Sequence, residues 1–188
     1  MAESKNNIIT HGLSGKVGDL IVFSQRNGKT IVSRAPKDRT GDYTDNQKLH
    51  QLKFQKATLY AKSVINDPDQ NQMYSAAAAD ASKGISTYNV AVADLLKAPD
   101  IETIDLSAYR GKIGNTIKIV VLDDFAVKAV SVKIENADGS LVEEGLAVDS
   151  GFEWIYTATA TNTDLAGDKI TIKATDHPAN MTEMTQTL

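Results

Sequence analysis

Alternation between hydrophobic and polar positions is clearest in residues 116–135. Two runs of β-branched residues flank a polar break at residues 122–125: Ile117, Ile119 and Val121 before it, and Val130, Val132 and Ile134 after it. A period of two places one set of side chains in a core and the other in water. The pattern predicts the first two strands of a β-sandwich, around which we expect the rest of the chain to be organised.

Further short strands follow in the C-terminal third, at residues 141–148, 152–159, 168–175 and 181–188. Turn residues such as Asp138 and Gly139 separate them, and residues 100–109 form an extended passage into the first strand. Short strands at near-regular spacing are typical of an immunoglobulin-like sandwich. We expect the single tryptophan, Trp154, to lie in its core.

Residues 7–35 predict a β-hairpin. Asn27 and Gly28 both tolerate the positive φ of a type I′ turn, and they separate apolar runs at residues 20–23 and 30–33. Pro36 ends the second strand. Because a lone two-stranded ribbon is marginal in water, the hairpin must pack on the helices, the sandwich or another subunit.

Helical periodicity between the hairpin and the sandwich predicts a compact helical layer. A capping box of Thr44 and Gln47 starts the first helix, which has a broad apolar stripe and ends near residue 66. Asp67 and Pro68 start a second helix that ends near Gly84, and a third spans residues 87–97. The predicted fold class is therefore α+β, with hairpin and helices in residues 1–99 and the sandwich in residues 100–188.

Composition excludes several kinds of chemistry. The 188 residues include no cysteine, which rules out disulfides, thiolate metal sites and a cysteine nucleophile. A formal charge of −4 gives no electrostatic reason to expect nucleic acid or an anionic membrane as a partner. Neither a secretory signal nor a membrane-length apolar run is visible, so we expect a chain that stays in the cytoplasm, leaves by a route without a cleaved signal, or is built into a particle or appendage.

Motifs for catalysis or cofactor binding are missing from the sequence. The glycines and lysine at positions 12–16 lack the spacing of a phosphate loop, and no G-x-S-x-G elbow occurs. His11, His50 and His177 lack the spacing of a zinc site. We therefore predict no enzyme, no cofactor and no assigned catalytic, cofactor-binding or metal-binding residue.

The most site-like feature is a set of aspartates at predicted strand ends and turns: Asp123, Asp124, Asp149, Asp164, Asp168 and Asp176. If several of these turns meet at one pole of the sandwich, their carboxylates could hold Ca²⁺, which takes six to eight oxygen ligands. Aspartate is also simply a favoured turn residue. Both explanations stay open at this point.

A further pattern of turn and core residues covers nearly the whole chain. Its N-terminal part consists of Gly12, Gly15, Lys16, Gly18, Gly28, Lys29, Arg34, Pro36, Gln47, Phe54 and Ala57. Its C-terminal part consists of Asp123, Asp124, Phe125, Asp138, Gly139, Trp154, Tyr156, Ala158, Thr159, Asn162, Gly167, Asp176, Pro178 and Asn180. In these residues the chain resembles a family of uncharacterised bacterial proteins, mostly from Bacteroidetes, known as the DUF6266 group. The resemblance implies this architecture and a bacterial or phage setting, and no activity. Ala179 replaces the family's usual glycine, which argues against a strict positive-φ requirement there.

These observations favour a non-enzymatic structural or interaction protein. Its hairpin would pair with a neighbouring sheet by β-augmentation, so the chain would self-associate, bind another protein or be incorporated into a particle such as a phage or appendage component. The alternative is a ligand- or glycan-binding module acting through the sandwich loops. That function requires an exposed loop aromatic, for which Tyr43, Tyr109 and Phe125 are the candidates.

Overall fold

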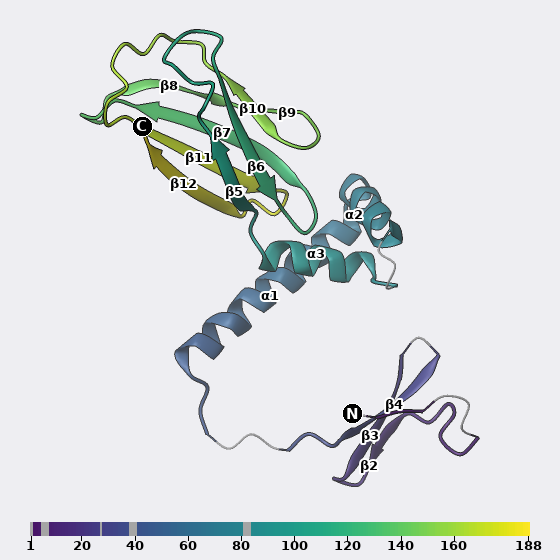
Figure 1. Ribbon diagram of the computed structural model, residues 1–188. Helices are drawn as coiled ribbons and strands as arrows, with labels where there is room; N and C mark the ends of the chain where they lie inside the picture. Colours follow the sequence, from purple (N-terminus) through teal and green to yellow (C-terminus); the bar gives the residue numbers. More distant parts are fainter. Residues whose placement is uncertain (1, 5–7, 27, 38–40, 81–83) are drawn as a thin grey trace. The chain divides into compact units, whose positions relative to one another are not determined.

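The computed structural model describes residues 2–4, 8–26, 28–37, 41–80 and 84–188, with only the backbone for residues 2–4. The chain has a mixed α+β fold with antiparallel sheets (Figure 1). It divides into two compact units, Met1–Thr44 and Asp45–Leu188. This division differs from the predicted boundary between residues 99 and 100, because the helices belong with the sandwich.

The N-terminal unit is a four-stranded sheet in the order β1-β4-β3-β2. Its strands are β1 (Ala2–Ser4), β2 (Gly15–Val17), β3 (Ile21–Arg26) and β4 (Lys29–Arg34). Strands β3 and β4 form the predicted hairpin, with Arg26 opposite Lys29 and Gly28 at a φ of 71°. The predicted turn residue Asn27 and the predicted start at Asn7 lie outside the described residues. The sequence pattern missed the two three-residue strands that flank the hairpin.

Three helices open the second unit: α1 (Asp45–Asn66), α2 (Pro68–Asp80) and α3 (Thr87–Leu96). The predicted cap of α2 is confirmed, because Asp67 Oδ1 accepts hydrogen bonds from the backbone N–H groups of Asp69 and Gln70. Ser86 caps α3 in the same way through Asn89. The segment before Gly84, where the second helix was expected to end, lies outside the described residues.

The broad apolar stripe predicted for α1 is only partly buried. Ala57, Ala61 and Val64 are fully buried, while Leu49, Leu52 and Leu59 are 54–66% exposed. Two of the three fully buried side chains are alanines, which allow α3 to approach α1 closely. The large leucine side chains of α1 stay on its surface.

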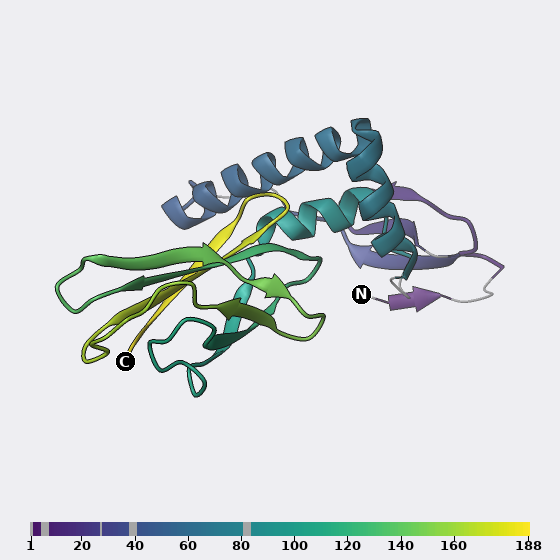
Figure 2. The same ribbon diagram turned by 90° about the horizontal axis from the view of Figure 1, so that it is seen from above.

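Two four-stranded sheets form the sandwich-like part of the second unit (Figure 2). One sheet has the order β5-β6-β10-β9, with β5 (Asp100–Asp105), β6 (Thr116–Leu122), β10 (Trp154–Thr157) and β9 (Val148–Asp149). The other has the order β12-β11-β7-β8, with β12 (Met181–Thr187), β11 (Lys169–Asp176), β7 (Val127–Glu135) and β8 (Leu141–Leu146).

Two of the predicted strand assignments are corrected by this topology. The expected passage into the sandwich contains β5, which pairs with β6. The expected third strand, residues 141–148, is two strands in different sheets. Between them the buried Ala147 donates its N–H to the carbonyl of Val130, and the chain crosses from one sheet to the other there.

The alternation predicted for β6 and β7 is confirmed. The sandwich core contains these fully or almost fully buried side chains: Ile101, Tyr109, Ile117, Ile119, Val130, Val132, Ile134, Tyr156, Ile170 and Ile172. Trp154 is only partly buried and packs against this core from its margin. Tyr109 and Tyr156 supply the buried aromatic volume that the sequence led us to expect from the tryptophan.

The helices and the sandwich are joined by the turn between β11 and β12. The side-chain amide of Asn180 donates to the carbonyls of Asp94 and Leu95 at the end of α3 and to the carboxylate of Asp176. Ala179, just before it, has a φ of 67°. The expectation that this position lacks a positive-φ requirement is wrong: alanine adopts the left-handed conformation here, at the cost that glycine would avoid.

Candidate functional site

The N-terminal sheet has one face that is more apolar than the other. Cross-strand pairing places Phe23 opposite Val32 and Val17 opposite Ile21. Since paired residues point to the same side of a sheet and alternate along each strand, these four side chains share one face. We call this set, Val17, Ile21, Phe23 and Val32, the apolar face. The opposite face carries the polar residues Lys16, Ser24, Arg26, Lys29 and Ser33 and two apolar residues, Val22 and Ile31.

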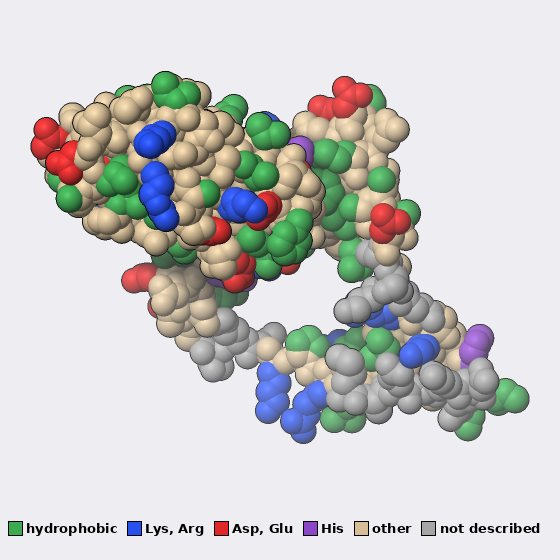
Figure 3. All heavy atoms as spheres, turned by 45° about the horizontal axis from the view of Figure 1, so that its top comes forward, with side chains coloured by type: hydrophobic (Ala, Val, Ile, Leu, Met, Phe, Trp, Pro, Cys, Tyr) green, Lys and Arg blue, Asp and Glu red, His purple; other side chains and the backbone are tan. Residues whose placement is uncertain are grey.

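A loop within the same unit covers only one end of the apolar face. Gln25 donates to the carbonyl of Leu13 at 2.7 Å, and the Thr30 hydroxyl donates to the carbonyl of Thr10 at 2.9 Å. Among the residues from 8 to 44 whose side chains are described, Thr30 and Ala35 alone are buried. Val17 is 55% exposed, and hydrophobic side chains are visible on this unit's surface in Figure 3. The sheet thus has too little cover from its own unit to form a core.

The aromatic residues expected in ligand-binding loops are mostly elsewhere. Tyr109 is 1% exposed, within the sandwich core. Phe125 stacks on Tyr74 of α2, with ring centroids 4.2 Å apart. Tyr43 is 44% exposed and belongs to the N-terminal unit. Tyr109 is therefore too buried to contact a ligand, and the ring of Phe125 is already stacked on Tyr74. Both rings stabilise the fold.

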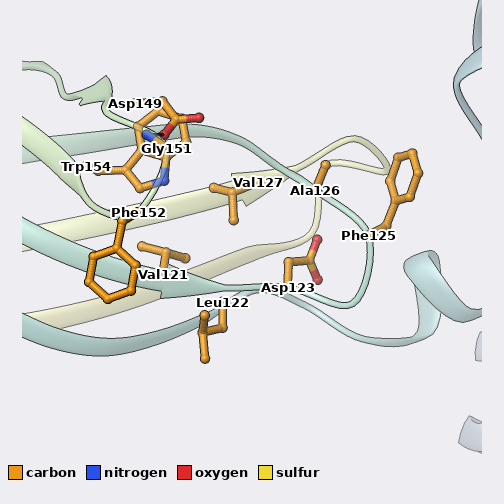
Figure 4. A pocket seen from close by; sticks show the side chains of 10 residues that line it. All are labelled: Val121, Leu122, Asp123, Phe125, Ala126, Val127, Asp149, Gly151, Phe152 and Trp154. Atoms are coloured by element: carbon orange, nitrogen blue, oxygen red, sulfur yellow. Dashed lines mark hydrogen bonds between the residues drawn. The ribbon is translucent and has the colours of Figure 1, made fainter. Parts of the chain in front are cut away.

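A shallow hollow of about 310 Å³ lies where the ends of β6, β7 and β10 meet (Figure 4). Val121, Leu122 and Trp154 line it, together with Phe152 from the turn that precedes β10. Phe152 is 82% exposed, and Figure 4 shows its ring directed toward the end of β6. It is an exposed sandwich-loop aromatic that the sequence analysis did not single out.

Among the described residues, the groups that could hold a metal ion include no histidine. His11 and His50 are exposed, His11 before β2 and His50 on α1. His177 is half-buried, with its ring 5.7 Å from that of Phe125 in an edge-on arrangement.

Three of the six aspartates singled out in the sequence hydrogen-bond to turns and loops, two of them within their own turn. Asp149 accepts from the N–H of Gly151, and Asp164 accepts from the N–H of Ala166. Asp168 is buried, and it accepts from the N–H of Ala137 at 3.1 Å and from the Asn162 amide at 2.6 Å. Turn and loop hydrogen bonding accounts for these carboxylates.

Asp124 and Asp123 are neighbours with different surroundings. Asp124 is exposed and forms an ion pair with Lys97, with Nζ and Oδ1 2.6 Å apart. Asp123 is partly buried, and its Oδ1 accepts from the N–H of Asp124 at 2.8 Å. Only Asp123 turns toward the junction between the helices and the sandwich, where it meets two other carboxyl groups.

Asp94, Asp123 and Asp176 form a cluster in which each offers an oxygen within 4.8 Å of the others. We call these three residues the aspartate cluster. Asp94 comes from α3, Asp123 from the connection between β6 and β7, and Asp176 from the end of β11. Asp94 is 1% exposed and Asp176 is fully buried. The cluster therefore gathers three acidic groups from distant parts of the sequence in a mostly buried place.

The surrounding groups bind only part of this negative charge. The Tyr74 hydroxyl donates to Asp94 Oδ2 and lies 2.8 Å from the Tyr60 hydroxyl. Asn180 donates to Asp176 from both its backbone and its side chain, at 2.6 and 2.7 Å. Asp94 Oδ1 and Asp123 Oδ2 are buried and have no hydrogen-bond partner in the described part of the chain.

Burial dominates the protonation equilibria at the cluster. Removal from water raises the pKa of Asp94 to about 7, the Tyr74 hydrogen bond opposes this rise, and the negative charges of Asp123 and Asp176 add to it. Burial also raises the pKa of Asp123. Burial and the hydrogen bond that Tyr74 donates to Asp94 both raise the pKa of Tyr74. The cluster is a place where uncompensated negative charge is costly.

Sequence reasoning identified Asp123 and Asp176 but missed Asp94. The signal was present in the helical pattern, because Asp94 lies three and four residues after Ala91 and Val90, on the apolar side of a short helix. A lone carboxylate at such a position must find a partner when it is buried. The partner positions come from the sandwich, which the local sequence does not reveal.

Comparison of the chain with protein-family models, with curated proteins and with solved structures finds no match. Among the described helices, α1 is the longest, and none combines the length and the apolar character that crossing a membrane requires. The resemblance noted from the sequence stays a prediction, and function has to be argued from the surfaces and groups described above.

Proposed function

We propose that this chain is a non-enzymatic structural protein that self-assembles, with its N-terminal sheet binding a second copy of the chain. In this proposal the short edge strands pair with a neighbouring sheet by β-augmentation, and the apolar face becomes buried against that neighbour. If each copy binds the next through this same contact, many copies can build a larger particle.

The observation that carries the proposal is the incomplete cover of the apolar face. Val17 is more than half exposed, and Ile21, Phe23 and Val32 are only partly buried. Apolar side chains left in water gain stability when a partner covers them. Strands β1 and β2 form the two edges of the sheet and have three residues each. A partner strand can pair with the backbone of either edge, and the rest of the partner can cover the apolar face.

Charge favours a second copy as that partner. Residues 1–44 contain seven Lys or Arg and four Asp or Glu, a formal charge of +3. Residues 45–188 contain thirteen Lys or Arg and twenty Asp or Glu, a formal charge of −7. Opposite charges on the two units attract a basic N-terminal sheet to the acidic unit of another copy. Such a head-to-tail contact uses two different surfaces and can repeat without closing.

An immunoglobulin-like identity for the sandwich fits this structural role. Lettered along the chain, one sheet has the order A-B-E-D and the other G-F-C-C′, which is the arrangement of strands in immunoglobulin-type domains. The tryptophan differs from that pattern, because Trp154 lies on β10 rather than on the strand that corresponds to C. Sandwiches of this kind commonly serve as spacers, an analogy at the level of the fold.

Substituting Phe23→Asp on the apolar face should abolish assembly, since a charge placed there cannot be buried against a partner. The measurement is particle mass by light scattering on a sizing column, at low and at high salt. We expect a large species for the natural chain, partly dissociated by salt, and a monomer for the variant.

The matched control is Ser24→Asp, one residue further along β3 and on the opposite, more polar face. This variant should assemble like the natural chain. Equal loss of assembly in both variants would show that charge on the sheet, and not the apolar face, is responsible. Unchanged assembly in Phe23→Asp would contradict the proposal.

A further inference from the structure

We propose that the aspartate cluster binds a divalent cation with oxygen ligands, Ca²⁺ fitting best, and that this ion holds α3 against the sandwich. The three carboxyl groups come from a helix, a loop and a strand end, so a shared ion would join all three elements. This inference concerns the second unit and does not depend on assembly through the N-terminal sheet.

Two unpartnered oxygens indicate a ligand. Asp94 Oδ1 is buried in a side chain that is 1% exposed, and Asp123 Oδ2 is buried as well, yet neither accepts a hydrogen bond from the described residues. A buried acceptor without a partner costs roughly 1–3 kcal/mol, and more when it carries charge. A cation shared by the cluster would satisfy both atoms at once.

The groups behind these oxygens hold them in place. Tyr74 binds the other oxygen of Asp94, and the N–H of Asp124 binds the other oxygen of Asp123. Asn180 fixes Asp176 with two hydrogen bonds. Hydrogen bonds of this kind orient the ligands in metal sites. They leave one oxygen of Asp94 and one of Asp123 without a partner, while both oxygens of Asp176 accept from Asn180 and would bind the ion through a remaining lone pair. Figure 4 shows Asp123 on its loop with its carboxylate directed away from the β6 strand.

In the described part of the chain, the cluster has no cationic side chain in direct contact. Lys97 pairs with the exposed neighbour Asp124, and its charge also acts on Asp123. Within the described part of the chain, the ion pairs include none of the three cluster residues. Three carboxylates within a few ångströms repel each other strongly in a buried place. A divalent ion removes most of that repulsion.

Coordination chemistry favours Ca²⁺ over Mg²⁺ at this cluster. Oxygens within 4.8 Å of one another are close enough to share one ion, and Ca²⁺ accepts an irregular set of six to eight oxygens at about 2.3–2.6 Å. Mg²⁺ needs ligands at about 2.0–2.1 Å in strict octahedral geometry and gives up water reluctantly. The partial exposure of Asp123 leaves a side on which water can complete the larger shell of Ca²⁺.

The test is thermal unfolding of the full chain in chelator, in CaCl₂ and in MgCl₂ at matched ionic strength. Because the ion binds only the folded cluster, saturating Ca²⁺ should raise Tm by roughly 5–10 °C, with a smaller effect of Mg²⁺. Titration calorimetry with Ca²⁺ alone should give one site per chain.

Two variants locate the effect. Asp94→Asn should lose the Ca²⁺-dependent rise in Tm while remaining at least as stable as the natural chain in chelator. Its neutral amide removes one of three repelling charges, keeps an acceptor for Tyr74 and can donate to Asp123. Asp124→Asn, which changes the exposed neighbour, should keep the Ca²⁺ response.

Two results would overturn the proposal. If the natural chain shows no Ca²⁺-dependent shift, the unpartnered oxygens share a proton instead of a metal ion. If Asp94→Asn shows the same shift as the natural chain, Ca²⁺ acts elsewhere on this acidic unit.

Discussion

Replacing Gly111 with alanine is expected to destabilise the sandwich by roughly 3–5 kcal/mol. Gly111 is buried with a φ of 71°, and an added Cβ would lie 2.1 Å from the backbone oxygen of Asn162. The two segments are joined by a hydrogen bond from the Asn162 N–H to the Gly111 carbonyl, so the backbone cannot move apart without breaking it. Urea unfolding followed by Trp154 fluorescence measures the loss.

Gly114 provides the control for this prediction. It also has a positive φ, 86°, but an added Cβ would meet no atom within 4 Å. Gly114→Ala should therefore cost only the conformational penalty, about 1–2 kcal/mol. Similar losses in the two variants would show that backbone conformation, and not the close approach to Asn162, sets the requirement at Gly111.

Replacing Asn180 with alanine is the second change for which we expect a large effect, a loss of about 2–4 kcal/mol. Its amide binds backbone carbonyls at the end of α3 and the buried carboxylate of Asp176. Alanine removes the side-chain donor from Asp176 Oδ2 and from the carbonyls at the end of α3, and only the backbone N–H of residue 180 still binds Asp176, at Oδ1. Because these bonds join the helices to the sandwich, we also expect the two parts to unfold less cooperatively.

Two probes can resolve that loss of cooperativity. Far-UV circular dichroism follows mainly the helices, and Trp154 fluorescence follows the sandwich. The two transitions should coincide for the natural chain and separate for Asn180→Ala. Asn136→Ala removes an amide that donates to Ser140 in its own turn, so it should cost less than about 1 kcal/mol and keep the transitions together. Coincident transitions in Asn180→Ala would contradict the junction described here.

The sequence predicted those elements whose cause is local. Period-two alternation located β6 and β7, and the Asp67 and Pro68 signals located the start of α2, because side-chain spacing and capping act within a few residues. The division of residues 141–148 between two sheets was missed, since the crossing at Ala147 depends on pairing with Val130 in β7. Local pattern alone does not fix such a partner.

The candidate site shows the same limit. Asp123 and Asp176 were singled out as turn residues, and their meeting with Asp94 required the packing of α3 on the sandwich. Likewise, Gly111 and Gly114 look equivalent in sequence, and only the approach of residue 162 distinguishes them. Phe125 was a candidate for an exposed loop aromatic, but stacking on Tyr74 places it at the junction. Long-range contacts decided each of these outcomes.

The central claim is that the N-terminal sheet makes this chain an assembling building block. The most direct measurement is the particle mass of the full chain by light scattering on a sizing column, beside the same chain lacking residues 1–36. The second unit is compact by itself, so the shortened chain should stay folded. We expect a large or polymeric species that falls to a monomer on truncation. A monomeric full chain would contradict the account. An assembly that survives truncation would also contradict it, and would indicate that the interface lies in the second unit, where the exposed leucines of α1 are the first candidates.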